Sequence, residues 1–179
     1  MFKFGRKRRL CSAFETMRPD LYRIAWSWCH DDAQAEDLVQ DTCVKALEKL
    51  DQLRNPERLR PWVLRIMANL HRDRYRGRRD IVTLSAHDEE LAATDPGPAE
   101  AAERNATVVM VHRAIASLGD DQRKVLTLVD VGGFSYAEVA EALEIPIGTV
   151  MSRLSRARVR LRRELMAEKE EITGLRCVK

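Results

Sequence analysis

The sequence predicts an all-α protein, in which two small helical domains are joined by a flexible linker and the second domain contains a helix-turn-helix. The first observation is a shortage of turn residues, because Gly and Pro account for only 14 of the 179 residues, against a usual share of ~12%. The second is that apolar residues recur at three- and four-residue steps, which is the periodicity of amphipathic helices. The third is a break in this periodicity near the middle of the chain, which separates two helical halves.

These patterns divide the chain into five segments. In order they are a basic tail (1–13), a first helical domain (14–80), an acidic linker (81–104), a second helical domain (105–170) and a C-terminal tail (171–179). The linker is predicted from its acidic, Ala-rich composition and from the turn-forming run Asp95-Pro96-Gly97-Pro98, a composition that does not form a packed core.

Charge is strongly segregated, although the formal net charge is only +3. The blocks Arg58–Arg79 and Thr149–Arg163 hold eight and six arginines, whereas Ile81–Asn105 holds six acidic residues and one arginine. Basic blocks of this kind are typical of surfaces that bind a polyanion, and solvated helix faces are the alternative. No apolar run approaches the ~18 residues of a membrane span, and the basic start leads into no apolar signal-peptide core. We therefore expect a cytoplasmic protein without membrane insertion.

The first domain is predicted to contain three helices, at about 14–30, 33–50 and 61–76. Asp31-Asp32 offers a cap for the second helix, in which Leu38 belongs to an apolar stripe that must be buried. Another side of that helix carries, at steps of three and four, Asp37, Gln40, Asp41, Val44 and Glu48. The third helix follows a turn at Asn55-Pro56 and carries on its outer face Arg65, Asn69, Arg72 and Arg76.

The second domain is predicted to contain four helices, at about 107–118, 122–130, 136–143 and 147–170. Ser135 and Glu138 form a capping box at the start of the third of these, and a tight turn precedes the last. One face of the last helix carries apolar residues, and the opposite face carries Thr149, Ser152, Arg153, Arg156, Arg160 and Arg163. This pattern favours a helix-turn-helix whose second helix enters a DNA groove. An amphipathic hairpin with a solvated basic face is the alternative.

Three blocks resemble bacterial RNA polymerase sigma factors, especially the extracytoplasmic-function (ECF) group. Tyr136–Ala140 followed by Gly148–Arg158 is similar to the fourth conserved region of that family. Ala35–Thr42 resembles its core-polymerase-binding helix, and Arg60–Asn69 followed by Asp73–Arg76 resembles its minus-ten segment. The resemblance covers roughly residues 20–165 in the family's order and spacing. It implies a sigma factor that binds core RNA polymerase and promoter DNA, and it also implies an anti-sigma partner.

The resemblance implies roles for particular residues. Contacts with core polymerase are expected from Asp37, Leu38, Gln40 and Asp41. Contacts with the melted minus-ten strand are expected from Arg54, Asn55, Arg60, Trp62, Arg65, Asn69, Arg72 and Arg76, although Trp62 fits core packing equally well. Contacts with the minus-thirty-five element in the major groove are expected from Thr149, Ser152, Arg153, Ser155, Arg156 and Arg158. Met151 is a departure, since some members carry Arg there.

Other functions fit the sequence less well. A sigma-like decoy that only sequesters an anti-sigma factor would not need the retained arginines and Asn69. An ordinary helix-turn-helix repressor would require a dimerisation surface, which no segment suggests. No enzyme motif with a phosphate-binding loop or paired zinc-binding histidines is present, and the four cysteines form no Cys-x-x-Cys pair. We therefore expect no catalysis, no small-molecule substrate, no cofactor and no metal.

Overall fold

The structure is a computed structural model that describes the backbone of residues 2–82 and 99–176 and the side chains of residues 7–8, 10–74 and 107–167. Within these ranges it contains helices and no strand, which confirms the all-α prediction. The helices of the first half are α1 (Phe2–Cys29), α2 (Asp32–Glu48) and α3 (Leu59–Val82). Those of the second half are α4 (Ala99–Ala116), α5 (Asp120–Leu126), α6 (Tyr136–Leu143) and α7 (Ile147–Arg176).

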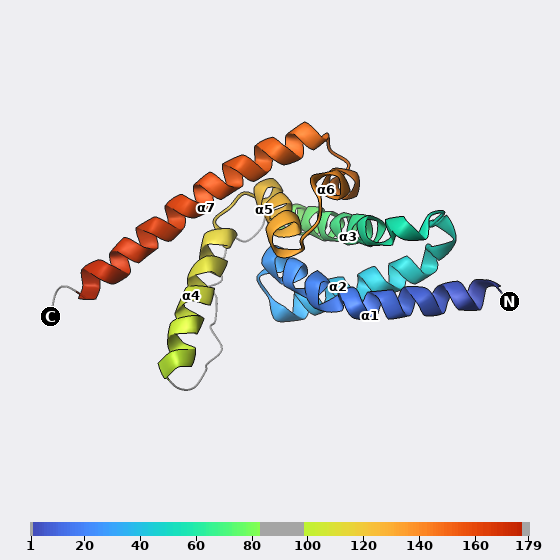
Figure 1. The fold of residues 1–179 in the computed structure, drawn as a ribbon, viewed down its shortest axis with the longest axis horizontal. Helices are drawn as coiled ribbons and strands as arrows, with labels where there is room; N and C mark the ends of the chain where they lie inside the picture. Colours follow the sequence, from blue (N-terminus) through green and yellow to red (C-terminus); the bar gives the residue numbers. More distant parts are fainter. Residues whose placement is uncertain (1, 83–98, 177–179) are drawn as a thin grey trace.

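The first domain is built from α1, α2 and α3, which pack against one another (Figure 1). Asp31 caps α2 as predicted, because its carboxylate accepts a hydrogen bond of 2.7 Å from the amide of Gln34. Two short 3₁₀ turns, Leu50–Gln52 and Pro56–Arg58, lead from α2 into α3. The cap at Asp31 satisfies a free amide at the start of α2, and a cap of this kind stabilises a helix by about 1 kcal/mol.

Helix α1 begins at Phe2, whereas the sequence predicted a basic tail up to residue 13 and a helix from Phe14. The apolar stripe explains the difference, because Leu10 continues the spacing of Phe14 and Met17 one turn earlier and is buried. Leu10 packs in a small cluster with Ala46, Leu50, Leu53 and Ile66. The backbone of residues 2–13, which were expected to form a tail, is therefore helical.

In the second domain, helix α4 begins at Ala99 rather than at the predicted Thr107, and helix α7 continues to Arg176. Residues 81–82 and 99–104 of the expected linker and 171–176 of the expected C-terminal tail are thus helical, while 83–98 and 177–179 lie outside the described residues. The predicted helix at 122–130 is divided, because α5 passes into a π-helical segment, Thr127–Val131. There the amide of Gly132 donates to the carbonyl of Thr127 at 2.9 Å.

The two domains lie directly against each other. Helix α6 packs on α3, and the π-helical segment packs on α1 (Figure 1). One cluster of buried apolar side chains runs from Phe14, Leu21 and Met67 in the first domain to Leu128 and Val150 in the second. The sequence predicted the two helical domains but no contact between them. Among the described residues, no helix is both long enough and apolar enough to cross a membrane.

Candidate nucleic-acid interface

Helix α6 begins with a capping box, as predicted. The hydroxyl of Ser135 accepts from the amide of Glu138 at 3.3 Å, and the carboxylate of Glu138 accepts from the amide of Ser135 at 2.9 Å. Glu144 ends α6 in the left-handed conformation, with φ of 55°. At the start of α7, the amides of Thr149 and Val150 donate to the carbonyl of Pro146. These local contacts determine the direction in which α7 leaves the turn.

Helix α7 divides into a buried and an exposed side. Val150, Leu154 and Ala157 are at most 2% exposed and attach the helix to the domain core. The residues expected at the minus-thirty-five element lie outside this buried stripe. Ser152, Ser155, Arg156 and Arg158 are exposed, and Thr149 and Arg153 are half-buried.

The arginines of α7 differ in their contacts. The guanidinium of Arg158 donates two hydrogen bonds to the carboxylate of Asp130, at 3.1 and 2.6 Å. These bonds raise the pKa of Arg158 and tie α7 to the π-helical segment. Arg153 forms an ion pair of 2.6 Å with Asp121, whereas Nε of Arg156 donates to the carbonyl of Ser152 within α7. An exposed ion pair contributes only about 0–1 kcal/mol, so a phosphate can replace such a carboxylate.

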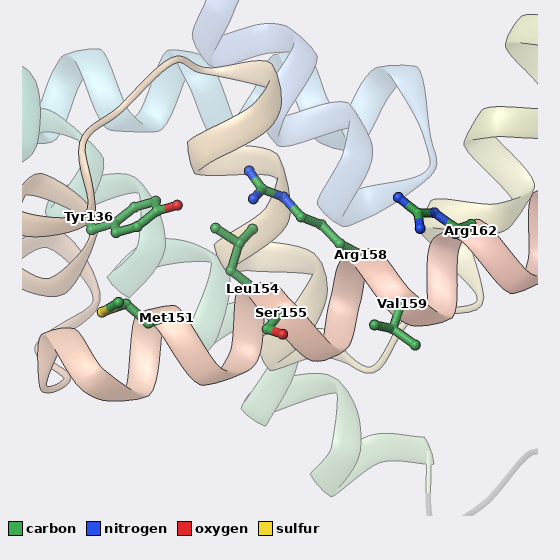
Figure 2. A pocket seen from close by; sticks show the side chains of 7 residues that line it. All are labelled: Tyr136, Met151, Leu154, Ser155, Arg158, Val159 and Arg162. Carbon is green, nitrogen blue, oxygen red and sulfur yellow. The ribbon is translucent and has the colours of Figure 1, made fainter.

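A shallow groove of about 300 Å³ follows the flank of α7 opposite Arg153. Figure 2 shows Tyr136 and Met151 at one end of the groove and Val159 and Arg162 at the other. Met151 and Val159 are 53% and 69% exposed. Met151, which stands where some family members carry Arg, therefore adds an apolar surface to this flank.

The first domain presents a cationic face along α3 and the turn before it. We define this face by its six residues: Arg54, Arg58, Arg60, Arg65, Asn69 and Arg72. All five arginines are exposed, and Asn69 is half-buried. A side-chain nitrogen of Arg72 donates to the amide oxygen of Asn69, so these two residues, both expected at the minus-ten strand, lie side by side. The side chain of Arg76, expected on the same face, lies outside the described residues.

Two further residues expected at the minus-ten strand have structural contacts. The side-chain oxygen of Asn55 accepts from the amide of Glu57 at 3.0 Å and caps the turn that leads into α3. Trp62 is half-buried and packs against the apolar core, which agrees with the core-packing alternative for this residue. Asn55 and Trp62 therefore both help to position the cationic face.

Helix α2 presents the surface expected to meet core polymerase. Asp37, Gln40 and Asp41 are exposed, and Asp41 forms an ion pair of 2.5 Å with Arg74 of α3. Leu38 is fully buried, so it supports the helix from the core and is not part of the exposed surface. Val44, which is 49% exposed, lies one turn beyond Asp41 on the same side of α2, as predicted, and adds an apolar surface beside the four expected contacts.

The structure brings residues from the two sets expected to bind DNA together across the contact between the domains. Asn69 and Arg72 of the first domain line the same cavity of about 190 Å³ as Asp121, Lys124 and Arg153 of the second. Because α3 and α7 are far apart in the sequence, periodicity contains no signal for this arrangement.

Acidic and aromatic residues of the second domain contact the cationic face. Arg58 pairs with Glu141 of α6 at 2.5 Å, and Arg65 pairs with Glu144. The guanidinium carbon of Arg60 lies 4.6 Å from the ring centre of Phe134, within the range of a cation–π contact. The sequence-based reasoning missed both Glu141 and Glu144, since their partners are separated from them by 83 and 79 positions.

Histidines lie at the contact between the domains. Burial, together with the nearby charge of Lys124, lowers the pKa of His71 to about 4. Burial and the charge of Arg123 lower the pKa of His30 to about 4 as well. Both side chains are therefore neutral at pH 7. In the part of the chain described by the structure, no group of three or more His, Cys, Asp or Glu residues is placed to hold a metal ion.

Two family models match the chain in series. Residues 13–81 match Sigma-70 region 2, and residues 109–161 match Sigma-70 region 4. The first match contains α2 and the cationic face, and the second contains the helix-turn-helix.

Curated relatives and solved structures agree with these matches. The ECF RNA polymerase sigma factor EcfG of Rhodopseudomonas palustris is 32% identical over 157 residues, which cover 87% of this chain and 84% of the relative. The RNA polymerase sigma-H factor of Pseudomonas aeruginosa is 33% identical over 138 residues, which cover 72% of each chain. The sigma factor RpoE of Bartonella quintana, solved with the anti-sigma factor NepR, superposes with a TM-score of 0.73 and 29% identity over 89% of this chain and 98% of that one. CnrH, solved with the cytosolic domain of CnrY, gives a TM-score of 0.67 and 27% identity over 92% of each chain. The chain therefore belongs to the ECF group of RNA polymerase sigma factors.

Proposed function

We propose that this sigma factor recruits core RNA polymerase to promoters by contacting two DNA elements with its two domains. The observation that carries this proposal is the order of the parts. A region 2 match with a cationic face is followed by a region 4 match with a helix-turn-helix. The factor itself performs no catalysis and needs no cofactor or small-molecule substrate, and it acts in the cytoplasm, where polymerase and DNA are.

The polymerase-binding surface in this proposal is the exposed side of α2. Asp37, Gln40 and Asp41 supply two carboxylates and an amide, and Val44 supplies an apolar contact. A surface of this kind complements a basic helical partner, since charge complementarity directs encounter and orientation. The four side chains are exposed and are not needed for the core of the domain, so they remain available to a partner.

The minus-ten strand is bound by the cationic face. Asn69 supplies an amide that reads base edges, and Arg54, Arg60, Arg65 and Arg72 supply positive charge for the phosphates. Capture of an unstacked base requires such donors together with cations along the backbone. Asn55 shapes the loop, and Trp62 supports α3 from the core. Arg76 remains a proposed contact that rests on the resemblance.

The minus-thirty-five element is read by the exposed side of α7. Thr149, Ser152, Arg153 and Arg156 lie within the first turns of the helix, which is the part that enters a major groove. Ser155 follows them along the exposed side. An arginine at such a position can pair with both acceptors of a guanine. Arg158 has the smaller role, because its hydrogen bonds to Asp130 must break before it can contact DNA.

Each domain alone makes few DNA contacts, so binding by the free factor is weak. Core polymerase holds the two domains at one separation, and two weak contacts then act as one strong contact. An anti-sigma protein is the further partner that we propose, since RpoE and CnrH were solved with NepR and CnrY.

In vitro transcription with core polymerase on a promoter library tests the proposal. Adding the protein should create new start sites that share one upstream and one downstream motif. A factor that binds core polymerase but starts no transcript would instead be a decoy. Tight binding to a palindrome without polymerase would indicate an ordinary helix-turn-helix regulator.

A further inference from the structure

We propose that Met151 reads a thymine of the minus-thirty-five element by packing against the methyl group of that base in the major groove. This inference rests on the proposed function, because it requires α7 to lie in the groove. It goes beyond the proposed function by adding an apolar contact, and with it a preference for one base, at a residue outside the set expected to contact this element.

Met151 is exposed on a helix that is firmly anchored. The residue before it, Val150, is fully buried, and Leu154 is only 2% exposed, so this part of α7 cannot rotate about its axis without disrupting the core. Met151 itself is 53% exposed, and Figure 2 shows its side chain on the flank of α7 at the same end of the groove as Tyr136. An apolar surface is therefore held outward at a fixed position.

Met151 shares its side of α7 with a residue that is already expected at the minus-thirty-five element. Ser155 follows it by four positions, which separates the two by about 40° around an α-helix, and both residues line the groove of about 300 Å³. Ser152 is the next residue along the chain and is exposed as well. Met151 therefore belongs to the same outward surface as two residues that are proposed to contact this element.

The position of Met151 along α7 distinguishes it from the exposed apolar residues farther on. With a rise of about 1.5 Å per residue, Met151 lies about 6 Å from the helix start at Ile147, whereas Val159 and Met166 lie about 18 Å and about 28 Å from it. The major groove of B-DNA is about 12 Å wide, and the second helix of a helix-turn-helix contacts base edges with its N-terminal residues. Met151 is thus within reach of the bases, while Val159 and Met166 lie beyond them.

The methyl group of thymine is the partner whose chemistry fits an exposed methionine at this place. Among the groups that base edges present in the major groove, the methyl group is the apolar one, and the others are hydrogen-bond donors and acceptors. Methionine has no strong donor or acceptor, and its unbranched, polarisable side chain adapts to an irregular apolar surface. A protein partner fits less well, since the neighbouring Thr149, Ser152 and Arg156 are polar and supply the donors that DNA requires.

Replacing thymine with deoxyuridine removes only the methyl group, so this replacement tests the contact directly. Promoters selected by the holoenzyme would be synthesised with each thymine of the minus-thirty-five element replaced in turn. At one thymine the wild-type holoenzyme should lose about fourfold in promoter affinity, which is the effect of burying one methyl or methylene group. The Met151→Ala holoenzyme should bind both promoters with equal affinity, because the side chain that contacts the methyl group is gone.

Met166→Ala is the matched control, since it removes the same kind of side chain from a position of α7 that is 60% exposed and lies farther from the helix start. This control should keep the full difference between the thymine and deoxyuridine promoters. Met151→Arg provides a second variant, because arginine pairs with guanine and not with a methyl group, so it should lose the preference for thymine. Both substitutions of Met151 should leave the helical circular dichroism spectrum unchanged, because the side chain lies outside the core.

The inference is overturned if no thymine of the minus-thirty-five element gives a methyl effect that depends on Met151. An equal loss by Met151→Ala on the thymine and deoxyuridine promoters would overturn it too, and would assign the side chain to a protein contact. Failure of the proposed function has a different signature, because the wild-type holoenzyme would then start no promoter-specific transcript on unmodified DNA. That result would refute the sigma activity and this inference together.

Discussion

The indole nitrogen of Trp28 donates a buried hydrogen bond of 2.8 Å to the hydroxyl of Thr127, and these residues belong to different domains. The hydroxyl of Thr127 in turn donates to the carbonyl of Arg123 at 2.8 Å. Apolar burial around them favours close contact but has no direction. The hydrogen bond does have direction, so it selects one position of the π-helical segment on α1.

Replacing Thr127 with valine should destabilise the chain by about 1–3 kcal/mol, because the buried indole N–H loses its acceptor while the size of the side chain is kept. Urea denaturation followed by tryptophan fluorescence would measure the loss. Thr16→Val is the matched control, since the exposed hydroxyl of Thr16 donates to the carbonyl of Ser12 within α1. Equal unfolding midpoints for Thr127→Val and the wild type would show that Trp28 finds another acceptor and that this pair does not fix the contact.

Local features were predictable from the sequence because their causes lie within a few residues. The cap at Asp31 and the capping box of Ser135 and Glu138 depend on neighbours three positions away. The buried stripe of α7 follows from helical periodicity alone. The early start of α1 was missed because basic residues around Leu10 masked one further apolar turn.

Long-range features could not be predicted in the same way. An arginine such as Arg65 suits a DNA contact whether or not Glu144 lies beside it in the fold. No spacing in the sequence relates the two residues. The same holds for Arg153, which faces the cavity that contains Asn69 only because the domains pack together. Periodicity identifies which side of a helix is apolar, but the partner of that side is decided by packing over the whole chain.

Acid should weaken the fold through His71. Burial lowers its pKa to about 4, and Lys124 and Arg123 add to this effect while Asp120 and the bond to the Trp28 backbone oppose it. Above pH 6.5 the imidazole is neutral in both the folded and the unfolded chain. As the pH falls from 6.5 toward about 4, the unfolded chain binds a proton that the folded chain excludes, so the free energy of unfolding decreases.

Between pH 7.5 and 5.5 the contribution of His71 to the free energy of unfolding should fall by roughly 1 kcal/mol. Urea denaturation at both pH values measures the decrease, and His71→Gln should show a smaller one because its side chain does not titrate. The pKa of His30 is lowered as well, so His71→Gln should keep part of the loss of stability with falling pH. An unchanged pH dependence in His71→Gln would exclude this histidine as a source.

The polymerase surface can be tested at Asp37, which is exposed on α2. Asp37→Arg should weaken co-purification with core polymerase and leave the helical circular dichroism spectrum unchanged, because the side chain is outside the core. Asp41→Arg should weaken binding as well, but it also places two arginines together, since Asp41 pairs with Arg74. Glu15→Arg, on the exposed side of α1, is the control for charge. Recovery of Asp37→Arg with polymerase at wild-type levels would remove Asp37 from this surface.

Arg153 provides the test of DNA readout by α7. If it pairs with both acceptors of a guanine, Arg153→Ala should reduce transcription from promoters that need the minus-thirty-five element by about 1–3 kcal/mol, which is roughly 5- to 150-fold. Arg162→Ala, on the groove flank of α7 opposite Arg153, should affect all promoters slightly and equally. Arg153→Ala also frees Asp121 from its ion pair, so thermal unfolding should be measured alongside transcription. A promoter library transcribed with unchanged preference at the guanine position would show that Arg153 does not read DNA.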